Sequence, residues 1–517
     1  MNALALINEQ ILDLSTKLKT DVSRFELESY AGFFTFFLRY RNDHPNFLDF
    51  SVFESPYKDF NYLVMLNASS QRGSETYITQ RDLNKWGVTL RKIKDLHQEA
   101  NLSQVNAIDD RAKAIHHLSF HSYFENGSLS YSEQDLERLA EFFRPFDGLI
   151  LSLYGFDSSF LVDFYLFSET LHGKKINIYN AFKSTDSFKL LYESAKNDQE
   201  PDEEVMDLFF SLPDSLREAM HKLHQASRFH PSEFYERFGK DRVDKLIEIF
   251  SLEATQDESF LFFTQNNPLD QRPILCLPDG HLLFFYQKQL PISFAGHLYE
   301  ILQKGKKADK VRKHRDTFME LKTKEIMQRL FNGKVNHISH SYHIEKNTEQ
   351  DILVLSSGLA LIIEIKASKF REPFRNSEKG FIRIRDDFKA SIQYGYEQAA
   401  RVERFFLAGK EFEIKDKKER VLYKVNPKKY PNVFTIIVTL ERFGPIQTDL
   451  SLLLNIEKQQ RYPWSVYIDD LEAITLALIK LYNNPLPPFT EYLKIRSKMH
   501  GGRLCRRRDG YCRRFPD

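Results

Sequence analysis

Two apolar runs separated by a two-residue turn constrain this chain more than any other feature. Residues 351–366, DILVLSSGLALIIEIK, consist of runs rich in Ile, Leu and Val on either side of Ser357-Gly358. Such runs around a two-residue turn, in which Gly tolerates a positive φ, are typical of a β-hairpin. With these two residues as the turn, the hairpin places Asp351 directly opposite Glu364.

The hairpin therefore displays charged side chains together on one face. Directly opposite residues share a face, with Cβ atoms about 5 Å apart. Lys366 lies two positions beyond Glu364 on the same strand, which returns it to that face. The other face is apolar and carries Ile352, Val354, Ile363 and Ile365.

Two opposed carboxylates indicate a bound cation. Like charges in this position are destabilising unless something compensates them. Mg²⁺ prefers carboxylate oxygens and keeps several waters, and Mn²⁺ is its expected substitute. A neighbouring Lys could act on a metal-bound water or on charge that develops on a phosphate. The alternative is a surface hairpin with a cross-strand salt bridge. A second E-x-K triplet, Glu413-Ile414-Lys415, lies in a charged run that indicates a solvated sheet edge.

The pattern resembles the PD-(D/E)xK nuclease superfamily, whose core is a helix, a three-stranded meander and a second helix. It is also similar to the nuclease-related domains of bacterial proteins, and the resemblance covers residues 305–490. It implies that Asp351 and Glu364 hold the metal and that the backbone carbonyl of Ile365 is a further ligand. It also implies that Lys366 acts on the water or on the transition-state charge.

The resemblance assigns the elements upstream of the hairpin as well. A helix expected over residues 314–331 carries Glu320, where the family tends to have a metal-site Glu near the helix start. Glu325 on the same helix is the competing candidate. Residues 334–344 would form the first strand of the meander.

Downstream, residues 386–409 predict a long helix that carries Gln393 and Gln398. Many members of the superfamily place a Gln on this helix near the metal, and the sequence leaves open which of the two it would be. Residues 432–443 predict a further strand, and residues 465–482 predict a strand that runs into a helix.

The rest of the chain predicts a mixed α/β (α+β) protein of more than one domain. We expect an acidic, helix-rich mixed α/β domain over 1–303, with a sub-boundary near 252. The nuclease-like domain spans 304–490, a mixed sheet flanked by helices, and a basic tail follows over 491–517. In the first domain the patterns predict helices over 132–146, 214–229 and 231–252, strands over 147–156 and 174–182, and two strands within 267–290 around the turn Pro278-Asp279-Gly280.

Charge is divided unevenly along a chain whose formal net charge is +1. Residues 304–429 hold 30 Lys and Arg against 18 Asp and Glu, whereas residues 1–303 hold 30 against 45. A basic segment around the candidate site favours a polyanionic substrate such as nucleic acid. The acidic first domain is instead expected to target or regulate the nuclease-like domain. It could do so by binding a second copy of the chain or a regulatory protein partner.

Composition places the protein in the cytoplasm. No apolar run reaches the length of a membrane span, and the first residues lack the basic start of a secretory signal. Three Cys argue against a disulfide framework. The tail 501–517 has six Arg with Cys505 and Cys512, which could contact phosphate or a metal; the favoured interpretation is an unfolded or non-native end.

The histidines do not indicate a metal site. His116, His117 and His121 lack a Cys or a clear carboxylate partner, so a metal site there is disfavoured. His337 and His343 would share a strand face but lie far apart along it. No Walker-type loop is present, so nucleotide hydrolysis is not predicted.

The sequence thus predicts a Mg²⁺-dependent nuclease that hydrolyses phosphodiester bonds, with DNA favoured over RNA and defence against foreign DNA as a biological role. No organic cofactor is expected. The alternative is a nuclease-like fold that binds nucleic acid or a protein partner without cleavage. Retention of Asp351, Glu364 and Lys366 speaks against that alternative, because a dead site need not keep them.

Overall fold

The structure is a computed structural model of the 517-residue chain. It describes residues 3–40, 49–103, 110–125, 130–186, 225–305, 307–333, 337–345, 348–368, 377–457 and 460–500, together with a few single residues between these ranges. The chain divides into two compact units, Met1–Ala100 with Phe124–Gly305 and Asn101–Tyr123 with Lys306–Asp517. Helices and two mixed sheets build both units, so the predicted mixed α/β class is confirmed.

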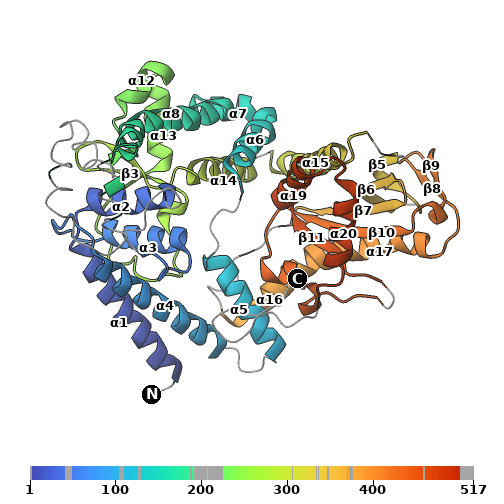
Figure 1. The fold of residues 1–517 in the computed structure, drawn as a ribbon, viewed down its shortest axis with the longest axis horizontal. Coiled ribbons are helices and arrows are strands. Elements are labelled where there is room, and N and C mark those ends of the chain that lie inside the picture. Colours follow the sequence, from blue (N-terminus) through green and yellow to red (C-terminus); the bar gives the residue numbers. More distant parts are fainter. Residues whose placement is uncertain are drawn as a thin grey trace. The chain divides into compact units, whose positions relative to one another are not determined.

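The first unit is mostly helical and has one small sheet (Figure 1). The sheet has the order β1-β4-β3-β2, with β2 and β3 parallel and the other pairs antiparallel. The helices are α1 (Ala3–Ser23), α2 (Leu27–Tyr40), α3 (Pro56–Ala68), α4 (Gln80–Ser103), α6 (Ser132–Phe143), α7 (Asp147–Tyr154), α8 (Ser158–Lys183), α12 (Ser232–Phe238), α13 (Lys240–Phe250) and α14 (Gln289–Lys304). The strands are β1 (Arg228–Phe229), β2 (Ser251–Glu253), β3 (Ile274–Cys276) and β4 (Leu282–Phe284).

Two strand predictions in this unit are wrong. Residues 147–156 and 174–182 belong to α7 and to the end of α8. A short apolar run fits a buried strand and a helix equally well, and here Gly155 ends α7 in a left-handed conformation with a φ of 76°. The prediction of one helix over 231–252 needs correction too, because Gly239 separates α12 from α13.

Other expectations for this unit are confirmed or lie outside the described residues. Helix α6 begins at Ser132, and β3 and β4 flank the turn around Gly280, whose φ is 83°. Most of the helix predicted over 214–229 lies outside the described residues, and its last two residues form β1. The tail 501–517 also lies outside them.

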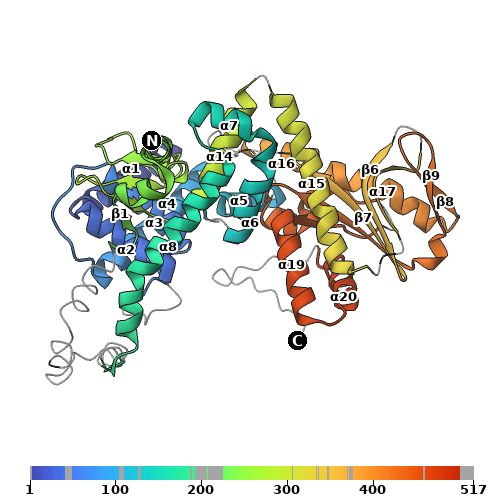
Figure 2. The same cartoon turned by 90° about the horizontal axis from the view of Figure 1, so that it is seen from above.

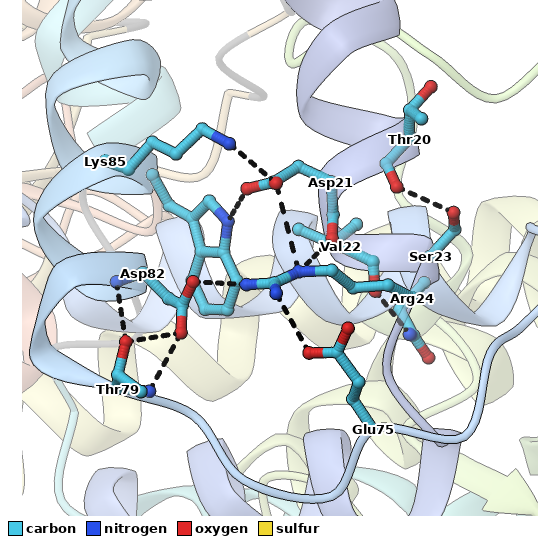
Figure 3. A network of polar contacts seen from close by, with 11 residues as sticks. Thr20, Asp21, Val22, Ser23, Arg24, Glu75, Thr79, Asp82 and Lys85 are labelled. Carbon is cyan, nitrogen blue, oxygen red and sulfur yellow. Dashed lines mark hydrogen bonds and ion pairs between the residues drawn. The ribbon is translucent and has the colours of Figure 1, made fainter.

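A polar network around Arg24 fastens the end of α1 to the start of α4 (Figure 3). Arg24 Nη1 lies 2.9 Å from Glu75 Oε2, and the same guanidinium pairs with Asp82. Trp86 Nε1 donates to Asp21 Oδ2 over 2.6 Å. Because the indole is fully buried, this bond satisfies a donor that would otherwise be costly to bury.

The second unit is built on a seven-stranded sheet with the order β11-β10-β7-β6-β5-β8-β9. Strand β10 runs parallel to β7 and β11, and every other neighbouring pair is antiparallel. The strands are β5 (His337–His343), β6 (Glu349–Ser356), β7 (Leu359–Lys366), β8 (Phe412–Lys415), β9 (Val421–Val425), β10 (Asn432–Thr439) and β11 (Trp464–Tyr467). The helices are α5 (Asp110–Glu125), α15 (Ala308–Phe331), α16 (Ser377–Phe388), α17 (Tyr394–Leu407), α18 (Pro445–Thr448), α19 (Ile468–Leu481) and α20 (Leu486–Arg496).

Helices cover both faces of this sheet (Figure 2). One face of the hairpin β6–β7 packs against α15, α19 and α20, through residues such as Ile352, Ile363 and Met327. The other face packs against α17, through residues such as Leu353 and Ile362. The hairpin therefore lies in the middle of the unit with apolar layers on both sides, which explains its near-continuous hydrophobic sequence.

Helix α5 is a difference from the expected division of the chain. The break between α14 and α15 lies at the predicted boundary near residue 304, but α5 packs on the second unit. Arg111 donates to the backbone carbonyls of Ser451 and Leu452 over 2.8 and 2.7 Å. Gly444 has a φ of 59°, and a Cβ there would lie 2.0 Å from the hydroxyl oxygen of Ser122.

The remaining elements of the second unit agree with the sequence patterns. The expected helices over 314–331 and 386–409 are part of longer helical segments, because α15 begins at Ala308 and α16 at Ser377. Between α16 and α17 the helix contains a π-helical turn, Lys389–Gln393. Within the described parts of the chain, no single helix is long and apolar enough to cross a membrane; the pair Ser132–Tyr154 and Ser158–Asn177 meets that test together but is bent by 83°.

Candidate active site

The hairpin register is the one expected from the sequence. Strands β6 and β7 pair from Ser356 with Leu359 to Ile352 with Ile363. The turn glycine, Gly358, has a φ of 74°. A residue with a side chain would be strained in this backbone conformation. One step further in the same register, Asp351 lies opposite Glu364.

The three charged residues of the hairpin converge. Lys366 Nζ lies 3.2 Å from Glu364 Oε2 and 3.6 Å from Asp351 Oδ2. The Glu364 side chain is fully buried, and those of Lys366 and Asp351 are 11% and 21% exposed. The arrangement is a largely buried ion cluster rather than the solvated cross-strand salt bridge considered as the alternative.

The backbone N–H of Ile365 donates to the Asp351 side chain rather than to the backbone of a neighbouring strand. Asp351 Oδ2 accepts a hydrogen bond of 2.6 Å from the N–H of Ile365, beyond the pair Ile352–Ile363 that ends the β6–β7 ladder. The N–H and C=O of one residue in a strand point toward the same neighbour. The carbonyl of Ile365 therefore also faces the Asp351 side of β7.

Electrostatics favour a cation at Glu364. Burial first, and then the nearby Asp351, raise the pKa of Glu364 to about 8, although Lys366 opposes the shift. Glu364 Oε1 is buried and has no hydrogen-bond partner among the described residues. A buried carboxylate oxygen without a partner is costly, and a bound cation would satisfy it.

Glu320 approaches the same site from α15. Burial, followed by the charges of Asp351 and Glu349, raises the pKa of Glu320 to about 7. The Glu320 carboxyl is therefore close enough to the hairpin to interact electrostatically with Asp351. Ser341 Oγ lies 3.5 Å from Glu320 Oε2. The competing candidate, Glu325, is 44% exposed and pairs with Arg329 one turn along the helix, as a solvated helix charge would.

A left-handed residue in β5 changes which face the strand presents. Ser341 has a φ of 48° and lies opposite Asp351 in the β5–β6 register, between the pairs of His340 and Tyr342. Ile338 packs with the α15 side of the sheet, whereas Tyr342 packs with the α17 side. Four residues along a regular strand would return to the same face, so the backbone at Ser341 redirects Tyr342 toward the face of Glu364.

Tyr342 is a residue that the sequence analysis did not single out. Its side chain is fully buried, and its hydroxyl has no hydrogen-bond partner among the described residues. Burial, then the charges of Glu364 and Asp351, raise the pKa of Tyr342 well above its ordinary value. No sequence pattern signals this position, because it depends on a single positive φ in a non-glycine residue.

The two candidate glutamines have different surroundings. Gln393 clamps the backbone of Asn455, accepting from its N–H over 2.9 Å and donating to its carbonyl over 3.2 Å. It also donates to Glu397, so its amide holds a loop rather than approaching the hairpin carboxylates. Gln398 is half-buried, and its Oε1 has no partner among the described residues.

Helix α17 covers the Lys366 side of the site. A Cβ on Gly395 would lie 3.3 Å from Lys366 Cε and 3.0 Å from Ile437 Cγ2, so this glycine makes room for the lysine. Tyr394, beside it, has its ring centroid 5.6 Å from Lys366 Nζ. An isolated Gly in a helical pattern often has a packing reason, and the sequence YGY offered that signal.

The other features considered in the sequence do not form such a site. The second E-x-K triplet lies on β8, one strand in from the expected sheet edge. There Glu413 pairs with Lys424 and Lys415, and its side chain is 38% exposed. His337 stacks on Tyr423 with 4.3 Å between ring centroids. Burial lowers the pKa of His116 to about 4, which is typical of a neutral core histidine.

The donor set fits a hard cation, although it is not arranged as a finished metal site. Among the described residues, no three His, Cys, Asp or Glu side chains are placed to hold a metal ion together. Lys366 Nζ pairs with both hairpin carboxylates instead. The unpartnered Glu364 Oε1, the carboxylate of Asp351 and the carbonyl of Ile365 are oxygen donors of the kind that Mg²⁺ takes.

Comparison with protein-family models, with curated proteins and with solved structures finds no match for this chain. The geometry of the site is therefore the basis on which a function is inferred for this chain.

Proposed function

We propose that the second unit is a metal-dependent nuclease, similar to the PD-(D/E)xK enzymes, that hydrolyses phosphodiester bonds of DNA. The observation that carries the proposal is the convergence of Asp351, Glu364 and Lys366 on one side of a buried hairpin. A purely structural ion pair would not need a second carboxylate with an unpartnered buried oxygen. The order helix, three antiparallel strands, helix around this hairpin gives the proposal further support.

Each residue has a role that follows from its position. Asp351 and Glu364, with the carbonyl of Ile365, would hold Mg²⁺ or Mn²⁺, and Glu320 would bind or position the ion from α15. When bound, such a metal lowers the pKa of a water and stabilises negative charge on phosphate. Lys366 would donate to the attacking water or to the phosphate oxygens, because its ammonium is held between the carboxylates and is largely shielded from solvent.

The charge of the segment agrees with a nucleic-acid substrate. Residues 304–429 carry an excess of 12 basic residues, and a basic surface attracts a phosphate backbone. We propose that the protein acts in the cytoplasm, where a nuclease of this kind could serve defence against foreign DNA. The acidic first unit would then target or regulate cleavage.

A second candidate is a module that binds nucleic acid or a protein partner without cutting. The observation that favours it is that Lys366 Nζ already pairs with both carboxylates, while no group of three metal ligands is found in the described parts of the chain. The same state is also what a nuclease would adopt before its metal binds.

Incubation of the purified chain with supercoiled plasmid, single-stranded DNA and RNA separates the two candidates. We expect cleavage with Mg²⁺ or Mn²⁺ that EDTA abolishes, with DNA cut in preference to RNA. Binding to any of these substrates without cleavage in either metal would favour the non-cleaving module. Cleavage that persists in EDTA would exclude the metal-dependent mechanism.

A further inference from the structure

Tyr394 occupies an unusual position in the helical segment that covers the site. The π-helical turn Lys389–Gln393 ends at Tyr394, whose backbone N–H bonds to the carbonyl of Lys389. This bond spans five residues, so the tyrosine follows Lys389 by one wide turn. Such turns insert one extra residue into a helix and often occur at functional sites.

After this wide turn, the adjacent residues Tyr394 and Gly395 have different surroundings. Gly395 turns inward, where its Cα is close enough to Lys366 that a Cβ would lie 3.3 Å from Lys366 Cε. Tyr394 remains at the surface with 52% of its area exposed. Its ring centroid nevertheless lies 5.6 Å from Lys366 Nζ, so the exposed ring adjoins the lysine of the site.

A ring that only shielded Lys366 would be buried against it. Tyr394 instead keeps about half of its surface open, in a site whose other members are largely buried. Lys389, one wide turn before the tyrosine, is also exposed. An open aromatic ring with one cation beside it, and a second exposed cation one wide turn earlier in the helix, suits a nucleobase next to its phosphates, because every base has a π-face and the backbone is anionic.

We propose that Tyr394 stacks on an unpaired nucleobase beside the phosphate that Lys366 contacts, and that Lys389 pairs with a neighbouring phosphate. This inference rests on the proposed function in assuming that nucleic acid enters the site. It narrows the substrate to single-stranded nucleic acid, or to duplex with a frayed end or overhang. A base within an intact duplex is covered by its neighbours and offers no free face to a side chain.

Binding of a fluorescein-labelled single-stranded oligothymidylate to the full chain tests this directly, with fluorescence anisotropy in EDTA so that no cleavage occurs. Tyr394→Leu should weaken binding about 5- to 150-fold, the change that corresponds to one stacked base. Tyr394→Phe should bind within about twofold of the parent, because the ring is retained. Tyr482→Leu is the matched control, since Tyr482 is 48% exposed in the same unit, and it should bind like the parent.

A blunt duplex closed at both ends by non-nucleotide linkers, so that every base is paired, forms the second arm, and its affinity should not depend on Tyr394. The inference is overturned if Tyr394→Leu binds oligothymidylate as tightly as the parent, if the Phe variant loses as much as the Leu variant, or if the parent binds only the blunt duplex. Tyr394-dependent binding by a chain that cleaves nothing supports the inference while removing the proposed hydrolysis. Metal-dependent cleavage that is unchanged in Tyr394→Leu leaves the hydrolysis in place and removes the inference.

Discussion

Replacement of Glu364 by Gln should stabilise the metal-free protein, and the gain should depend on pH. The pKa of the folded carboxyl is raised to about 8 from an ordinary value of 4.5, first by burial and then by Asp351. As the pH rises from 4.5 to 8, the unfolded chain releases a proton that the folded chain retains. Each pH unit in this window therefore lowers the free energy of unfolding by about 1.4 kcal/mol.

At pH 7 this loss amounts to about 3 kcal/mol, and Gln cannot ionise in either state. We expect Glu364→Gln to be more stable than the parent by roughly that amount at pH 7 in EDTA. The two proteins should be equally stable near pH 3, where the Glu364 carboxyl is protonated in the folded and in the unfolded parent. Denaturant titrations at several pH values measure the difference, and the emission of Trp464, buried in the second unit, reports the relevant transition when Trp86 of the first unit is replaced by Phe in both proteins. Excess Mg²⁺ should stabilise the parent but not the variant.

A gap that is absent at pH 7, or that stays constant between pH 4.5 and 8, would refute the electrostatic reasoning. The control is Glu413→Gln in the exposed second E-x-K triplet. Its carboxyl is 38% exposed, so its replacement should change stability by less than about 0.5 kcal/mol at any of these pH values.

Three further predictions concern packing and charge. Gly395→Ala should lower kcat about 10- to 100-fold by displacing Lys366, with little change in oligonucleotide affinity; an unchanged kcat in single-turnover assays would show that the lysine is not held by this contact. Gly444→Ala should destabilise the second unit by about 1–3 kcal/mol, because α5 packs against that position. Ser122→Gly should recover part of the loss in a double-mutant denaturation cycle, and additive effects would argue against direct contact. Affinity for single-stranded DNA should fall with salt, and Lys389→Gln should reduce the slope of log affinity against log salt by about 0.7, one phosphate contact; an unchanged slope would remove that contact.

The hairpin and its charged face could be predicted because they depend on local rules. The turn Ser357-Gly358 sets the register, and strand alternation then places Asp351, Glu364 and Lys366 together. The choice between Glu320 and Glu325 could not be made from the sequence, since both lie on one helix. It required the structure, in which Glu325 pairs with Arg329 and Glu320 approaches Asp351.

Other features depended on backbone conformations or long-range contacts that no pattern encodes. The positive φ of Ser341 brings Tyr342 to the face of Glu364, and a non-glycine residue in that conformation leaves no signature in the sequence. The packing of α5 on the second unit joins residues more than 300 positions apart. The apolar runs that form α7 and the end of α8 were predicted as strands, because a short apolar run fits a strand and a helix equally well.

The most direct test of the proposed site is the rate at which single-stranded DNA is cut in Mg²⁺ by the parent, Asp351→Ala, Lys366→Ala and the matched control Lys415→Ala. Lys415 belongs to the second E-x-K triplet on β8, and its side chain is 30% exposed. We predict that the two site variants lose at least about 10²- to 10³-fold in rate, while they remain folded and Lys415→Ala cuts like the parent. Cleavage by folded Asp351→Ala at the rate of the parent would contradict the assignment of this hairpin as the catalytic site.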